Sequence, residues 1–275
     1  MRERTGSRPA LLLGWSAVAY LLLAVIAAAT EPTAQSLLER TRELGRTTRK
    51  WTDRTQHLKL RIIDRRGGER QREVVITVKK YPEERTRSLL LFAAPQDVKG
   101  VGVLQWGDPK GTDEQWLYVP EVKRIRRISG SAKRESFVGT DFTYEDLAII
   151  TQITDWTDTE ARATLLRDDE IDKQKYHVIE FTPTGKDLSY GKLLVWLRAD
   201  DLLLLRFEMS DKTGQVQKRL TLADVRPVGT IPSAFRMEMT NLQSGSHTVV
   251  EFSDIKYDSG LDDGAFTQGA LEHGL

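Results

Sequence analysis

Three carboxylic acids in an aromatic-rich stretch, Gly100–Leu147, are the first side chains whose types and spacing could carry chemistry. They are Asp141, Glu145 and Asp146. Two carboxyl groups on either side of a substrate can act as a general acid and a general base. The same acids can begin a helix, because Thr143 stands where an N-cap residue is expected and acids in a first turn stabilise a helix start. Spacing alone orients neither carboxyl toward a substrate, so helix capping is the favoured interpretation.

Motifs of known catalytic and metal sites are absent from the sequence. It contains no G-x-S-x-G, no H-E-x-x-H, no glycine-rich phosphate loop and no cysteine. The four histidines are scattered, and two of them, His57 and His177, alternate with apolar neighbours as ordinary strand histidines do. The sequence therefore predicts a protein that is not an enzyme, with no catalytic residues, no metal site and no cofactor.

The N-terminal segment, residues 1–30, is expected to insert into a membrane. Three arginines occur among its first eight residues, and residues 9–30 carry no charged side chain. An apolar length of about 20 residues fits either a retained anchor or a secretory signal peptide. Small side chains at Ala27–Ala29 suit a signal peptidase, so cleavage is the favoured interpretation. Residues 31–275 would then be a single soluble domain in the periplasm, with a retained inner-membrane anchor as the alternative.

Composition gives no reason to expect a nucleic-acid partner. The chain has 41 basic and 40 acidic residues, and removal of the three leader arginines with Glu3 leaves 38 and 39. A basic run at 123–127 lies in a strand-like segment, where a solvated strand face is its ordinary explanation. Without cysteine the exported domain has no disulfides, so it must be stabilised by burial alone.

Hydrophobic periodicity predicts one short helix followed by a long series of strands. Thr33 can cap a helix over 34–45, and from Trp51 onward apolar residues recur at every second position, as in antiparallel strands. No strand–helix–strand alternation occurs, which disfavours a parallel α/β sheet. Eleven to thirteen strands are expected, within 56–63, 72–81, 87–93, 102–106, 114–119, 123–128, 161–167, 176–182, 191–198, 202–209, 216–226, 233–242 and 247–257, with short helices near 144–151 and 262–271.

Several strands are apolar on both faces, and this bears on function. Leu89–Phe92, Leu193–Leu197 and Leu202–Leu205 are of this kind. A strand in a sheet with one solvated face is apolar on the other face only, so something must cover the second side of these strands. The few helices are candidates for that cover. A curved sheet under a helical lid would enclose an apolar space.

Two consecutive segments carry a resemblance to a known family. WLYVPEVKRIRRIS at 116–129 leads into SFVGTDFTYEDL at 136–147, and together they resemble the outer-membrane lipoprotein-sorting proteins, relatives of the periplasmic lipoprotein carrier LolA. The similarity covers about 34–257, and its most specific part is 137–147. The resemblance implies a mainly β fold, in which a strongly curved antiparallel sheet forms an incomplete β-barrel covered by a few α-helices. It also implies an apolar interior that receives acyl chains.

The function implied is a periplasmic carrier that shuttles lipid or lipoprotein acyl chains from the inner membrane towards the outer membrane. An inner-membrane transporter of the ABC or RND type would be its partner. The alternative is a non-catalytic envelope scaffold, or an accessory protein of an inner-membrane lipid exporter. The residues expected to face the ligand are the apolar strand positions Leu58, Leu60, Ile62, Val74, Ile76, Val78, Leu193, Val195 and Leu197, with the aromatic residues Trp106, Trp116, Phe137 and Phe142 near the mouth or lid.

Overall fold

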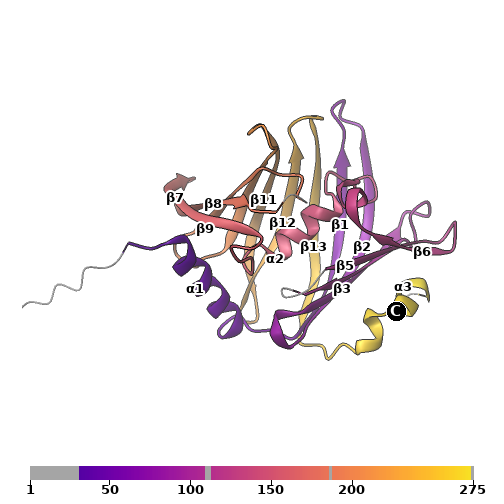
Figure 1. Ribbon diagram of the computed structural model, residues 1–275. Helices are drawn as coiled ribbons and strands as arrows, with labels where there is room; N and C mark the ends of the chain where they lie inside the picture. Colours follow the sequence, from indigo (N-terminus) through magenta and orange to yellow (C-terminus); the bar gives the residue numbers. More distant parts are fainter. Residues whose placement is uncertain (1–30, 109–112, 186–187, 274–275) are drawn as a thin grey trace, which may run out of the picture. The chain divides into compact units, whose positions relative to one another are not determined.

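The alternating apolar positions form one continuous antiparallel sheet in the computed structural model, which describes residues 31–108, 113–185 and 188–273 (Figure 1). The expected signal peptide, residues 1–30, lies outside the described residues. The strands are β1 (Asp53–Ile63), β2 (Glu69–Lys80), β3 (Thr86–Ala94), β4 (Gly102–Gly107), β5 (Glu114–Val119), β6 (Arg124–Ile128), β7 (Ala161–Ile171), β8 (Gln174–Pro183), β9 (Lys192–Arg198), β10 (Leu204–Ser210), β11 (Val216–Val228), β12 (Ile231–Asn241) and β13 (Ser246–Tyr257).

The sheet is open, with β6 and β7 as its two edges. Its order is β6-β5-β4-β3-β2-β1-β13-β12-β11-β10-β9-β8-β7. Every neighbouring pair is consecutive in sequence except β1 and β13, which join the two halves of the chain. The expected mainly β fold with an antiparallel sheet that is not closed into a barrel is therefore confirmed, and each expected strand is present with ends that differ by a few residues.

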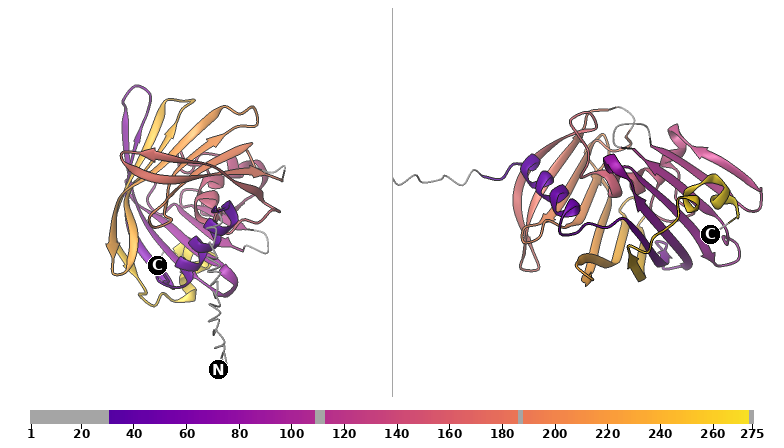
Figure 2. Two further views of the ribbon diagram at one scale, coloured as in Figure 1. Left: turned by 90° about the vertical axis from the view of Figure 1, so that its left-hand side faces the viewer. Right: turned by 90° about the horizontal axis from the view of Figure 1, so that it is seen from below.

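The sheet within Pro32–Leu275 is strongly curved, so it has a concave and a convex face (Figure 2). Register shifts interrupt five of the strand pairings, β1 with β13, β2 with β3, β7 with β8, β9 with β10 and β10 with β11. A bulge bends its strand and increases the local twist, which favours this curvature.

Helices α1 (Ala34–Arg46) and α2 (Tyr144–Gln152) lie on the concave face (Figures 1 and 2). Thr33 caps α1 by accepting a hydrogen bond from the backbone N–H of Ser36, which confirms the expected helix start. α2 belongs to the segment that connects the edge strands β6 and β7. Its buried side chains join those of the concave strands in one hydrophobic core that includes Leu37, Phe92, Ile149 and Phe207. Among the described residues, no helix is long and apolar enough to cross a membrane.

The C-terminal segment covers part of the convex face. A single helix over 262–271 was expected, and this prediction is wrong, because the segment forms a 3-10 helix, η3 (Asp263–Phe266), and a short helix, α3 (Gln268–His273). Thr267 between them is extended, and its hydroxyl accepts a hydrogen bond from the backbone N–H of Ala270, which starts a new helix. Two further 3-10 helices are η1 (Pro82–Glu84) and η2 (Gly130–Arg134).

Candidate functional site

A cavity of about 540 Å³ lies on the concave face, between the sheet and helices α1 and α2. Ligand pockets in proteins commonly have volumes of this order, and most of their lining is apolar. The part of the lining that comes from the sheet is supplied by β1 to β4 in one half and by β10 to β13, with the turn before β10, in the other half. The apolar side chains of the lining include Leu58, Ile76, Val78, Leu90, Leu147, Ile150, Leu203, Leu204, Leu205, Leu222, Val225, Met237, Phe252 and Ile255.

Strand register explains why these side chains meet. Ile76 on β2 lies opposite Gln56 on β1 and Leu90 on β3, so the three side chains point to the same face. Leu58 lies opposite Phe252 on β13, which carries the row across the junction between the two halves of the sheet. The cavity is therefore lined by residues far apart in sequence that the β1–β13 pairing brings together.

Three of the residues expected to face a ligand line this cavity, namely Leu58, Ile76 and Val78. Eight others are almost fully buried, and all of them except Ile62 belong to the hydrophobic core of the concave side. These eight are Leu60, Ile62, Val74, Phe137, Phe142, Leu193, Val195 and Leu197. Phe137 packs against Phe92 and Tyr144, with ring centroids 5.6 Å apart in both pairs. The structure thus places these eight side chains in packing positions around the cavity.

The two tryptophans expected near the mouth or lid lie on the convex face. Trp106 and Trp116 contact each other edge to face, with centroids 5.0 Å apart. They belong to a second, smaller cluster with Leu104, which the C-terminal segment covers with Phe266. The indole N–H of Trp106 donates a hydrogen bond of 3.0 Å to the backbone oxygen of Phe266. The sheet therefore separates these two rings from the cavity.

One end of the cavity is polar and holds two basic side chains, Arg54 of β1 and Lys80 of β2. Both lie against the indole ring of Trp51, with Lys80 Nζ 4.2 Å and Arg54 Cζ 5.2 Å from the ring centroid. Burial is the main reason why the pKa of Lys80 is lowered; the charge of Arg54 lowers it as well, whereas Glu84 and Asp155 oppose this. Burial, together with the charge of Glu84, raises the pKa of the Asp155 carboxyl.

A second cavity of about 640 Å³ lies beside α1. It shares four lining residues with the first, namely Arg42, Arg46, Glu84 and Asp155. The side chains of Arg46 and Glu84 are 49% and 44% exposed, so the polar end reaches solvent. The apolar cavity consequently has a charged opening next to α1.

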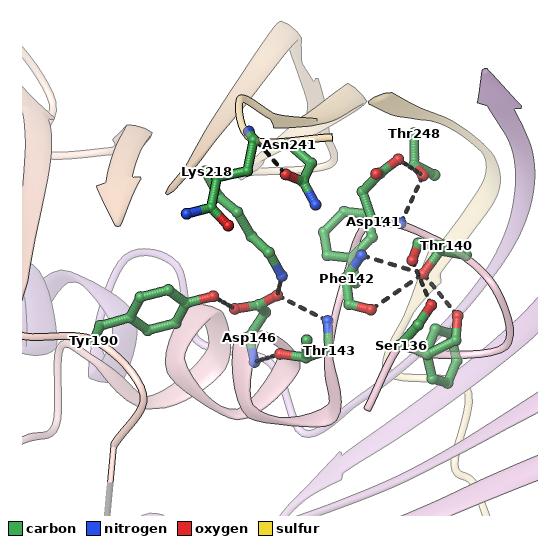
Figure 3. A network of polar contacts seen from close by, with 12 residues as sticks. Ser136, Thr140, Asp141, Phe142, Thr143, Asp146, Tyr190, Lys218, Asn241 and Thr248 are labelled. Atoms are coloured by element: carbon green, nitrogen blue, oxygen red, sulfur yellow. Dashed lines mark hydrogen bonds and ion pairs between the residues drawn. The ribbon is translucent and has the colours of Figure 1, made fainter. Parts of the chain in front are cut away.

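A buried polar network fixes the start of α2 (Figure 3). Asp146 completes a capping box with Thr143, accepting a 2.8 Å hydrogen bond from its backbone N–H. The same carboxylate accepts 2.6 Å hydrogen bonds from Lys218 Nζ of β11 and from the hydroxyl of Tyr190. Burial is the main cause that raises the pKa of Tyr190, and the charge of Asp146 adds to it. The favoured interpretation of Asp146 as a helix-capping residue is confirmed.

Asp141 and Glu145, which were considered with Asp146 as possible acid and base, also have structural partners. Asp141 accepts hydrogen bonds from the hydroxyls of Ser246 and Thr248, which ties the segment before α2 to β13. Glu145 accepts a 3.0 Å hydrogen bond from the backbone N–H of Ser189. Within the described ranges no group of three or more histidine, cysteine or acidic side chains could hold a metal ion. The geometry of this stretch is thus that of a helix anchor.

Residues at the polar end were missed by the sequence analysis, although a signal for them exists. Arg54 stands two positions before Gln56 and four before Leu58, so the strand period puts the guanidinium on the same face as the apolar row. Lys80 follows Val78 in the same way on β2. A basic residue two positions beyond the last inward-facing residue of a strand is the sequence pattern that would have indicated Arg54 and Lys80.

Comparisons with known proteins agree with this fold. A family model described as an uncharacterized protein matches residues 84–273. No curated protein matches the chain. A solved structure of an outer membrane lipoprotein-sorting protein domain from Vibrio parahaemolyticus is 29% identical, with a TM-score of 0.77, and the match covers 86% of this chain and 97% of that one.

Two further solved structures are similar over the same part of the chain. A DUF1329 family protein from Desulfovibrio piger is 28% identical, with a TM-score of 0.79, over 86% of this chain and 97% of that one. A LolA superfamily protein from Nitrosomonas europaea is 22% identical, with a TM-score of 0.65, over 86% and 98%. The last of these likenesses concerns the fold alone.

Proposed function

The chain belongs to the family whose model matches residues 84–273, and from its similarity to a solved outer membrane lipoprotein-sorting protein domain we propose that it is a periplasmic carrier of lipid or lipoprotein acyl chains. It takes its cargo at the inner membrane and shuttles it towards the outer membrane, and it performs no covalent chemistry. Residues 31–275 act as one lipid-binding domain, and an inner-membrane transporter of the ABC or RND type delivers the cargo.

The observation that carries this proposal is the apolar cavity under α1 and α2. Exposing hydrocarbon to water costs about 0.8 kcal/mol for each methylene group, so a chain of about ten methylenes gains about 8 kcal/mol on full burial. A cavity lined by Leu58, Ile76 and Phe252 offers that burial, and its charged opening lets a polar head remain hydrated. A carrier needs both features, since it must hold a chain in water and later release it.

The test is to purify the protein, extract it with organic solvent and identify bound lipids by mass spectrometry. Wild-type protein should retain acyl lipids at close to one per chain. Leu58→Trp and Leu222→Trp fill the cavity from the two halves of the sheet, and the double variant should retain far less lipid. Leu166→Trp is the matched control, because Leu166 of β7 is 46% exposed. Equal lipid content in all variants would refute the proposal, and no lipid in any would favour an envelope scaffold.

Export is proposed from residues 1–30, and it has a separate test. Cell fractionation of the full-length protein should recover it in the periplasmic fraction, and sequencing of its N-terminus should give a start near Glu31. An intact N-terminus in the inner-membrane fraction would replace the signal peptide with a retained anchor.

A further inference from the structure

Along the concave face of β1, β2 and β3, the side chains change from charged to uncharged polar and then to apolar. Lys80 lies opposite Thr86, Val78 lies opposite Ser88, and Ile76 lies opposite Leu90. On β1 the same direction runs from Arg54 through Gln56 to Leu58. All of these residues line the cavity, so its wall passes from cationic through mildly polar to hydrocarbon within a few residues. Such a gradient matches an amphiphile with a charged head and an apolar chain.

Arg54 and Lys80 at the polar end are not neutralised by a direct ion pair within the part of the chain that the structure describes. Among the described residues, neither Arg54 nor Lys80 forms an ion pair or a side-chain hydrogen bond, and the Nε atom of Arg54 is buried without any acceptor. Both cations lie against the ring of Trp51, so two like charges are close together. An aromatic face compensates a cation only weakly, and like charges disfavour each other. Buried polar groups without a partner are rare in proteins and call for an explanation.

The neighbouring acids do not supply the missing partner. The cavity lining has four basic side chains and two acidic ones, Glu84 and Asp155. Glu84 accepts a 2.8 Å hydrogen bond from Arg46, which occupies it as an ion-pair partner. Asp155 is close enough to act on the pKa of Lys80, yet burial disfavours its charged form. The polar end therefore keeps an excess of positive charge.

We propose that this end is a head-group site, in which Arg54 and Lys80 bind the anionic head of an amphiphile while its hydrocarbon chain runs past Ile76 into the cavity. The inference rests on the proposed lipid-carrier function and names the chemical class of its cargo. A carboxylate or a phosphate fits, because an arginine can bind either through two parallel N–H donors and a lysine binds either as a point charge. An uncharged amphiphile with the same chain would leave both cations unpaired.

The experiment compares four probes by isothermal titration calorimetry on the purified full-length protein, after its bound lipid has been removed and mass spectrometry has verified the removal. Dodecanoate, dodecyl phosphate and dodecanol share one hydrocarbon chain, and inorganic phosphate has the head without the chain. Dodecanoate and dodecyl phosphate should bind at least tenfold more tightly than dodecanol, which corresponds to about 1.4 kcal/mol. Inorganic phosphate should bind at least a hundredfold more weakly than dodecyl phosphate.

The double variant Arg54→Gln, Lys80→Gln should lose at least tenfold in affinity for both anionic amphiphiles and keep its affinity for dodecanol within twofold. Dodecanol binding thus also reports that the variant is folded. Arg61→Gln is the matched control, because Arg61 is on the same strand, faces the other side and pairs with Glu69 at 2.8 Å. It should bind all probes as the wild type does.

Each of the other outcomes contradicts the head-group site, the amphiphilic cargo or the carrier function. Equal affinity of wild-type protein for dodecanol and dodecanoate, or an unchanged double variant, overturns the head-group site and leaves the lipid carrier standing. Inorganic phosphate that binds as tightly as dodecyl phosphate overturns the amphiphile as the cargo of this site. Failure of all three amphiphiles to bind overturns the carrier function itself, and the head-group site with it.

Discussion

Removal of the buried ammonium of Lys218 should destabilise the protein strongly. Lys218 of β11 and Asp146 of α2 form a 2.6 Å ion pair whose side chains are only 9% and 0% exposed. Lys218→Met keeps the apolar stem and leaves the carboxylate buried with its hydrogen bonds from Thr143 and Tyr190 but without a counter-charge. Breaking a buried pair in this way costs about 3 to 5 kcal/mol. A chain of this size loses about 2 to 4 °C in Tm per kcal/mol, so Tm should fall by about 10 °C.

The assay is urea denaturation and differential scanning calorimetry, with two reference variants. Asp146→Asn in the Lys218→Met background removes the unpaired charge while an amide oxygen can still accept from Thr143, so this double variant should recover stability. Arg126→Met breaks a pair with Glu135 whose side chains are 51% and 53% exposed, and it should cost less than about 1 kcal/mol. Equal losses of stability for Lys218→Met and Arg126→Met, or a double variant less stable than Lys218→Met, would contradict a strong contribution from the buried ion pair.

Three further outcomes are expected elsewhere in the structure. Phe266→Ala should cost about 3 to 5 kcal/mol in urea denaturation and increase dye binding to the convex face, because a fully buried ring is lost; an unchanged midpoint would contradict this. The hydrogen bond from Arg61 lowers the pKa of Glu69 from 4.5 to about 2, so the stabilisation is complete above pH 4.5 and is lost as the pH falls towards 2. Arg61→Gln should return the pKa of Glu69, measured by NMR titration, towards 4.5. Burial and then Asp263 raise the pKa of Tyr81 to about 12, so Asp263→Asn should lower the ultraviolet titration midpoint of this phenol towards 10, and no change would contradict the contact.

The strands and helix starts were predictable because their causes are local. Alternation of apolar residues marks each strand, and Thr33 and Thr143 each stand at the first turn that they cap. The prediction of one continuous helix over 262–271 was wrong for a local reason as well. The Thr267 hydroxyl accepts a hydrogen bond from the backbone N–H of Ala270 and so begins a second helix. These features depend on side chains that are neighbours in sequence.

The position of the candidate site was less predictable, because it depends on which face of the sheet is concave. Leu89 and Leu90 are both buried, one under the C-terminal segment and the other on the cavity side. A period of two separates the two faces but says nothing about which one the helices cover. Trp106 and Trp116 were expected near the mouth or lid, but they lie in the cluster under Phe266, because their side relative to the cavity depends on the curvature of the whole sheet.

The arrangement of α2 explains how the same fold can be stable and still hold a cavity. Its first turn is held by the capping box and by the Lys218–Asp146 pair, which are directional contacts. Beyond this turn, Leu147 and Ile150 face the cavity and are only partly buried. Arg42 of α1 donates a 2.6 Å hydrogen bond to the backbone oxygen of Thr154 just after α2. Because these directional contacts lie at the two ends of α2, the helix can be fixed in position while Leu147 and Ile150 between them leave space for a hydrocarbon chain.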